Sequence, residues 1–215
     1  METATRSSPF DEPILVLDGA CGTSIQAMDL PPSAWDRYSG CNEYLNLSAP
    51  DAIVGLHESF LDAGAMVLET NTFGASAVVL AEYDLANRVE RINHAAVENA
   101  RKAIGGRKAW IAGSIGPTTK LASLGHISFE KLSEAYSQQI RALVEAGVDM
   151  LLVETCQDLL QVKIALVTCH EVFEKLGHGV PVMVSLTVET TGTVSYTHLR
   201  AHETPEHLVC RLLLE

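Results

Sequence analysis

Five short apolar segments, separated from one another by longer amphipathic segments, constrain the fold of this chain most. Each is almost continuously hydrophobic, as a strand that is covered on both faces of a sheet must be. They span residues 14–19, 66–71, 109–116, 149–155 and 181–188. Strands that alternate with helices in this way predict repeated βα units and a parallel sheet.

Helical periodicity fills the intervening segments. It covers about residues 51–63, 76–82, 86–104, 128–146 and 158–176. Ser128 and Asp158 are predicted N-caps, because their side chains can accept hydrogen bonds from the free N–H groups of a first helical turn. Gly64, Gly147 and Gly177 follow predicted helix ends, where glycine is favoured. The polar residues 1–13 are interpreted as an N-terminal extension.

A weak internal repeat favours a barrel over an open dinucleotide-binding sheet. LDAGAMVLETN (61–71) is similar to LVEAGVDMLLVET (143–155), and in both a helix end is followed by a buried strand that ends in Glu-Thr. No G-x-G-x-x-G fingerprint follows the first predicted strand. We therefore predict an α/β fold of the (β/α)8 TIM barrel family, truncated after about five βα units.

Charge and composition exclude several classes of partner. The formal net charge is −12 and the isoelectric point is about 5.0, which argues against nucleic acid or an anionic membrane as a partner. We find no apolar run long enough to span a bilayer and no secretory signal at the N-terminus. Five scattered cysteines fit free thiols in a reducing compartment, so we expect a cytoplasmic protein.

Polar side chains gather where the predicted strands end. They are Asp18, Glu69, Thr70, Asn71, Ser114, Glu154, Thr155, Thr187 and Glu189. Because a (β/α)8 barrel places its active site at the carboxyl ends of its strands, these residues predict a polar pocket at that face. Several carboxylates there could hold an ammonium group.

Six segments together resemble the homocysteine-binding domain of the cobalamin-dependent methionine synthases. They occur in the same order as in that family and extend the resemblance over about residues 14–192. The segments are LDGACGTSIQ, GCNEYLNLSAPDAI, AGAMVLETNTFGAS, INHAAVENAR, IAGSIGPTTK and GVDMLLVETCQDLLQVKIAL. GCNEYLNL (40–47) favours this branch over the betaine-dependent homocysteine methyltransferases.

The resemblance implies a reaction as well as a fold. In the family a zinc ion holds the sulfur of homocysteine as a thiolate, whereas a free thiol with a pKa of about 8.5 is mostly protonated at neutral pH. The thiolate takes a methyl group from methylcobalamin to give methionine. Cobalamin and methyltetrahydrofolate are bound by later domains of the full-length enzyme, so the implied partners are homocysteine and the cobalamin domain of the same longer chain.

The resemblance also assigns substrate-binding residues. Asp18 and Gly19 match the family's substrate-binding Asp-Gly, and Glu154 matches the glutamate that holds the substrate's amino group. Asn71 and Ser114 are further candidates for the pocket wall, with Thr72 beside them. The alternatives are structural: Glu154 could cap the next helix, Asp18 could serve a turn, and the others could bond local backbone.

No metal ligand is predicted in the part of the chain that resembles the family. The family's zinc ligands are one cysteine after the sixth strand and an adjacent pair after the eighth, and both positions fall beyond residue 193. Cys21 replaces a methionine of the family, and Cys156 has no counterpart among the ligands. The remaining candidates are interpreted as inert thiols or as packing and surface histidines: Cys41, Cys169, His57, His94 and His170. We therefore expect this fragment to be inactive as a methyltransferase.

Residues 194–215 depart from the family pattern. His198, His202, His207 and Cys210 have a spacing that a zinc site could use. However, SYTHLRAHETPEHLVCRLLLE resembles translated sequencing-adapter DNA. We interpret this family-foreign tail as a sequencing or assembly artefact; a genuine zinc-binding tail is the alternative.

The leading hypothesis is therefore the homocysteine S-methyltransferase module of a methionine synthase, present as a fragment. One alternative is a stand-alone homocysteine methyltransferase that uses betaine or S-methylmethionine. Another, of a different class, is a non-catalytic barrel that binds homocysteine without zinc.

Overall fold

The computed structural model describes residues 9–187 of the 215-residue chain. Its centre is a parallel sheet in which the strand order follows the chain: β1 (Val67–Glu69), β2 (Trp110–Ile115), β3 (Met150–Cys156) and β4 (Val182–Leu186). In the described residues, each strand pairs in parallel with its sequence neighbour. This order and direction confirm the predicted repetition of βα units.

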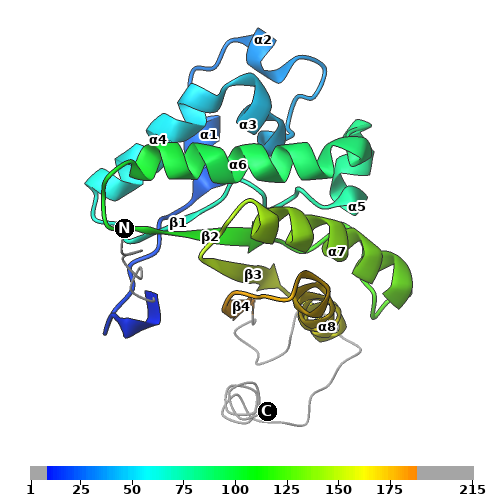
Figure 1. The fold of residues 1–215 in the computed structure, drawn as a ribbon. Helices are drawn as coiled ribbons and strands as arrows, with labels where there is room; N and C mark the ends of the chain where they lie inside the picture. The colour runs from blue at the N-terminus through cyan, green and yellow to red at the C-terminus, as the bar shows by residue number, and fades with distance from the viewer. Residues whose placement is uncertain (1–8, 188–215) are drawn as a thin grey trace.

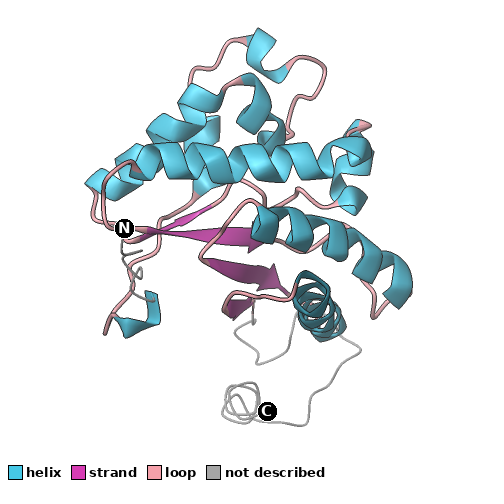
Figure 2. Cartoon of the chain, viewed as in Figure 1, coloured by secondary structure: helices cyan, strands magenta, loops and turns pink. Residues whose placement is uncertain are grey.

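The helices form a layer along one side of this sheet (Figures 1 and 2). Helices α4, α6, α7 and α8 contact one another in that order, as right-handed crossovers between neighbouring parallel strands require. The described helical elements are η1 (Pro9–Asp11), α1 (Cys21–Gln26), α2 (Pro32–Trp35), η2 (Asn42–Tyr44), α3 (Leu45–Ser48), α4 (Pro50–Asp62), α5 (Ala77–Leu80), η3 (Ala81–Tyr83), η4 (Ala86–Arg88), α6 (Val89–Ile104), α7 (Phe129–Glu145) and α8 (Leu159–Leu176).

Strands β1, β2 and most of β3 bury both faces, as their continuous hydrophobicity predicts, whereas β4 is only half-buried. Leu68, Ile111 and Leu151 point toward the helices and join the largest cluster of buried residues. Val67 and Trp110, one position earlier on their strands, point to the opposite face and join a second cluster. This alternation is the reason that each strand reads as an unbroken apolar run.

The predicted helix starts are confirmed by the capping hydrogen bonds. Ser128 Oγ accepts from the backbone N–H of Lys131 at 3.4 Å, and Asp158 Oδ1 accepts from that of Leu160 at 2.9 Å. Gly177, which directly follows α8, has φ +73°, a conformation that glycine adopts without strain. These local signals set the limits of α7 and α8.

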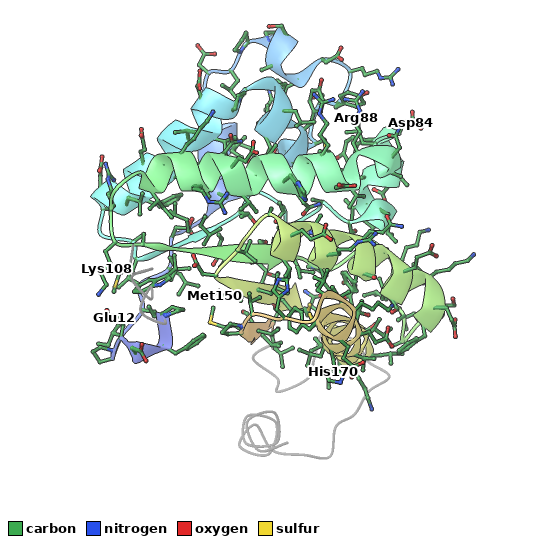
Figure 3. The ribbon with its side chains drawn as sticks, viewed as in Figure 1. Glu12, Asp84, Arg88, Lys108, Met150 and His170 are labelled. Carbon is green, nitrogen blue, oxygen red and sulfur yellow. The ribbon has the colours of Figure 1, made fainter. Side chains whose placement is uncertain are left out.

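The first predicted strand, 14–19, is reduced to a single bridge. Leu17 pairs in parallel with Val67, and the N–H of Asp18 donates to Val67 O at 3.0 Å. Ile14 is 74% exposed, so this part of the segment lacks the burial that its sequence predicts. Near the sheet's opposite end, Lys108 forms an ion pair with Glu12 (Figure 3).

The predicted truncation after about five βα units stays a prediction, because residues 188–215 lie outside the described part of the chain. Within residues 9–187, no helix combines the length and the apolar character needed to cross a bilayer.

Candidate functional site

A cavity of about 450 Å³ opens at the carboxyl ends of the first three strands. All five residues predicted to bind substrate line it. Asp18 and Gly19 follow the Leu17 bridge, Asn71 follows β1, and Ser114 and Glu154 lie near the ends of β2 and β3. The other lining residues are Ala20, Cys21, Gly22, Asn42, Glu43, Glu69, Thr70 and Phe73. The structure therefore brings the predicted residues together; their binding role stays a prediction.

Asp18 is held at the cavity by the neighbouring strand. The backbone N–H of Glu69 donates to the carboxylate of Asp18 and lies 3.1 Å from each of its two oxygens. The side chain of Asp18 is only 2% exposed. Asp18 therefore belongs to the sheet's hydrogen-bonding pattern and is more than a turn residue.

Glu154 is oriented from two sides. Ser114 Oγ donates to its Oε1 at 2.5 Å, and Thr155 Oγ1 donates to its Oε2 at 3.4 Å. Thr155 has φ +57°, which is rare for a β-branched residue, and the pairing of β3 with β4 shifts register between Val153 and Cys156. The irregular strand end thus lies directly beside the cavity's glutamate, where strained backbone often marks a functional site.

Asn71 both lines the cavity and bonds local backbone. Its Nδ2 donates to Asn42 O at 2.8 Å, and its own backbone O accepts from Asn46 Nδ2 at 2.7 Å. These bonds fasten η2 and α3 to the end of β1. Thr72 is fully buried, and its Oγ1 donates to Ser114 O at 2.7 Å, so it supports the strand end behind the cavity wall.

The cavity is strongly acidic. Burial, more than any other effect, raises the pKa of Asp18 to about 7 and that of Glu69 to about 8. The negative charge of Glu154 raises both further. None of the lining residues is Lys or Arg. A cation that enters would be stabilised by all three carboxylates and would favour their ionised forms.

Sequence reasoning assigned no substrate role to one lining carboxylate, Glu69, and did not name another, Glu43, for the site. Glu69 belongs to the strand-end set but has no role in the resemblance, although its strand-end position is a usable signal. Glu43 comes from η2, and its Oε1 accepts from the N–H of Gly74 at 2.7 Å. It lies in GCNEYLNL (40–47), a segment of the resemblance, but no predicted strand ends there.

The described residues do not fit a zinc site. Among residues 9–187, no group of three or more His, Cys, Asp or Glu side chains could hold a metal ion. Cys21 begins α1 and Cys156 ends β3, and neither belongs to such a group. His170 is exposed on α8 and lies 3.4 Å from Glu174 (Figure 3). The histidines and the cysteine of the 194–215 tail lie outside the described residues.

Comparison with known proteins identifies relatives. A family profile described as homocysteine S-methyltransferase matches residues 15–213. Methionine synthase from Mycobacterium tuberculosis (strain ATCC 25618 / H37Rv) is 40% identical over 186 residues, which are 84% of this chain and 16% of that protein. Methionine synthase from Mycobacterium leprae (strain TN) is 38% identical, with 84% of this chain and 15% of that protein covered. The chain therefore spans less than a fifth of either relative.

A solved structure has the same fold. The homocysteine methyltransferase MmuM from Escherichia coli, in its oxidized form, superposes with a TM-score of 0.68 at 21% sequence identity, over 95% of this chain and 70% of that chain. Its metallated form gives 0.66 at 23% identity, over 86% and 68%. The parallel sheet and its helical layer are thus similar to part of that enzyme's fold.

Proposed function

Because this chain belongs to the homocysteine S-methyltransferase family, we propose that the cavity at its strand ends binds homocysteine, with the ammonium group between Asp18, Glu69 and Glu154. One observation carries this proposal: Asp18 after the Leu17 bridge, Glu69 at the end of β1 and Glu154 near the end of β3 line one cavity, and that lining includes no cationic side chain. The empty cavity has no positive charge to balance these carboxylates, and an ammonium group would supply one.

Each residue has a distinct part in this binding. Glu154 and Asp18 accept hydrogen bonds from the ammonium group, and Gly19 lets the ligand approach the backbone beside Asp18. Ser114 holds Glu154 in place. Asn71 lines the cavity beside Cys21, whose Sγ lies 3.9 Å from Asn71 Oδ1.

Calorimetric titration with three thiols tests this proposal. Homocysteine carries both an ammonium and a carboxylate group, 4-mercaptobutyrate lacks the ammonium, and 3-mercaptopropylamine lacks the carboxylate. We expect loss of the ammonium to weaken binding at least about hundredfold, because it leaves buried carboxylates unpaired. Loss of the carboxylate should cost less. Equal affinity for homocysteine and 4-mercaptobutyrate would contradict the proposal.

We further propose that the chain is the homocysteine-binding part of a longer cytoplasmic methionine synthase. The two mycobacterial relatives support this, since the match covers only 16% and 15% of their lengths. We assign methylcobalamin and methyltetrahydrofolate to other domains of that protein. Because no group within residues 9–187 could hold a metal ion, we assign substrate binding to those residues, and the inactivity of the fragment stays a prediction.

Titration of homocysteine with and without zinc separates the catalytic reading from a non-catalytic binding barrel. For residues 9–187 we expect zinc to leave the affinity for homocysteine unchanged. If zinc also leaves the affinity of the intact source protein unchanged, that result would favour the non-catalytic barrel. A stand-alone enzyme that uses betaine or S-methylmethionine would methylate homocysteine with those donors and without cobalamin.

The tail needs its own test. We propose that residues 194–215 are foreign to the domain, although the family match extends to residue 213 and argues against this. Resequencing the source DNA across the codons for Gly192 to Glu215 distinguishes a foreign tail from a genuine one. A reading frame that continues into further strands and then encodes one cysteine and an adjacent pair supports the proposal; an unchanged tail overturns it.

A further inference from the structure

A histidine lies buried against Asp18, on the side of helix α4. His57 is 1% exposed, and its Nδ1 lies 4.0 Å from Asp18 Oδ2. Neither of its ring nitrogens has a hydrogen-bond partner within the described part of the chain, and both are fully buried. His57 does not line the cavity, so it meets Asp18 from behind the wall.

An imidazole in this position needs an acceptor. Even a neutral ring carries one N–H, and a buried donor without a partner is destabilising. Asp18 Oδ2 is the nearest acidic oxygen to the ring, and closing 4.0 Å to hydrogen-bonding distance requires a movement of about 1 Å. A small rotation of either side chain would provide it.

We propose that His57 is a positioning residue for Asp18: its Nδ1–H donates to Asp18 Oδ2 when the cavity is occupied and holds the carboxylate toward the ligand's ammonium group. This deepens the proposed function and depends on Asp18 receiving that group. Glu69 N already donates to the same carboxylate, so His57 would give Asp18 a second fixed donor from the helical layer.

The charge state of the pair agrees with this geometry. Burial lowers the pKa of His57 to about 4, so the ring is neutral at pH 7 and acts as a hydrogen-bond donor, not as a counter-ion. The other ionisable groups around Asp18 are Glu69 of β1, Glu154 of β3, Cys21 of α1 and Glu43 of η2. None of them is cationic, so none of them offers Asp18 an ion pair.

Nitrogen NMR of the histidine-labelled chain tests the pairing by a readout other than affinity. We expect a neutral His57 with the proton on Nδ1, and a change in its Nδ1 shift when homocysteine is added. The Nε2–H tautomer would overturn the proposal, whether or not homocysteine binds. Failure of the unmodified chain to bind homocysteine would instead overturn the proposed function, so the two failures are distinguishable.

Two substitutions separate positioning from packing. His57→Asn places an amide N–H close to the position of Nδ1, whereas His57→Phe fills the space without a donor. We expect H57F to weaken homocysteine binding about tenfold and H57N to stay within about threefold. The pH midpoint of binding should rise in H57F, because Asp18 loses a donor to its charged form.

Packing alone predicts a different result. It would weaken H57N and H57F equally and leave the pH midpoint unchanged, and that outcome would overturn the proposal. H57F with the affinity and midpoint of the unmodified chain would overturn it as well. His170→Phe, an exposed change on α8, is the matched control and should alter neither value.

Discussion

Ser114 on β2 donates a hydrogen bond of 2.5 Å to Oε1 of Glu154 on β3, so the cavity's glutamate is oriented by the neighbouring strand. The backbone around Ser114 is itself fixed, since its N–H donates to Thr70 Oγ1 at 3.1 Å and its carbonyl accepts from Thr72 Oγ1. A site built on paired strands keeps its geometry better than one built on loops. The orientation of Glu154 is therefore a property of the sheet.

Ser114→Ala should weaken homocysteine binding about tenfold, because it removes the shorter hydrogen bond to a charged carboxylate. Thr155→Ala is the matched control: it removes the longer bond, 3.4 Å, to the other oxygen of Glu154. We expect T155A to change the affinity by less than about threefold. Calorimetry on both variants at one pH measures the difference. A larger loss in T155A than in S114A would show that the loop, not the sheet, orients Glu154.

The free energy of unfolding of the empty protein should fall as pH rises from about 4 to 8. Burial raises the folded-state pKa of Asp18 from 3.8 to about 7 and that of Glu69 from 4.5 to about 8. In that range the folded state binds more protons than the unfolded state, so stability decreases with pH. His57, with its pKa lowered from 6.5 to about 4, opposes this trend only below about pH 6.5. The steepest loss should therefore lie above pH 6.5.

Urea unfolding at intervals between pH 5 and pH 8 measures this slope. Glu69→Gln should reduce it, since the amide cannot titrate, and Glu58→Gln on the exposed face of α4 should leave it unchanged. Saturating homocysteine should also flatten it, because the ammonium group stabilises the ionised carboxylates. Stability that rises with pH across this range would mean that the carboxylates are not buried as described.

The described cysteines should react slowly with iodoacetamide at pH 7.5. Burial raises the pKa of Cys21 to about 12, and Cys21 is the only thiol of residues 9–187 that is not fully buried. The reactive thiolate is therefore scarce, and we expect labelling at least about tenfold slower than that of a free thiol. Mass spectrometry in a Cys210→Ser background checks this, with the urea-unfolded chain as the fully labelled control. Rapid labelling of Cys21 would contradict its burial.

The sequence predicts the regular parts of this fold well, because each depends on local physics. The segment 109–116 becomes β2, and Ser128 and Asp158 cap the helices that they precede. The site residues Asp18 and Glu154 meet because parallel strands end on one edge of a sheet, which the strand pattern already implies.

The remaining features depend on contacts that no local pattern reveals. Residues 14–19 read as a strand, but strand pairing also needs a neighbour, and the structure provides only the bridge from Leu17 to Val67. Thr155 has a left-handed backbone, whereas a β-branched residue favours an extended one. The residue type therefore predicts the wrong backbone conformation at this position. Glu43 reaches the cavity from η2, at which no predicted strand ends, and His57 is buried although a helix histidine is more often exposed.

Gly116→Ala should destabilise the protein and disturb the cavity, because residue 116 has no room for a side chain. A Cβ there would lie 2.6 Å from Phe73 O, the same atom that accepts the hydrogen bond from Gly116 N at 3.0 Å. Neither backbone can move away without breaking that bond, so we expect a loss of about 2 kcal/mol in the free energy of unfolding. Phe73 lines the cavity, so homocysteine binding should weaken as well.

Gly55→Ala is the matched control, because its Cβ would meet nothing within 4 Å and it lies inside α4. Alanine should stabilise that helix by about 0.5–1 kcal/mol without a change in affinity. Urea unfolding and calorimetry on the pair measure both effects, and a G116A variant as stable as the unmodified chain would show that Phe73 does not pack against this strand end.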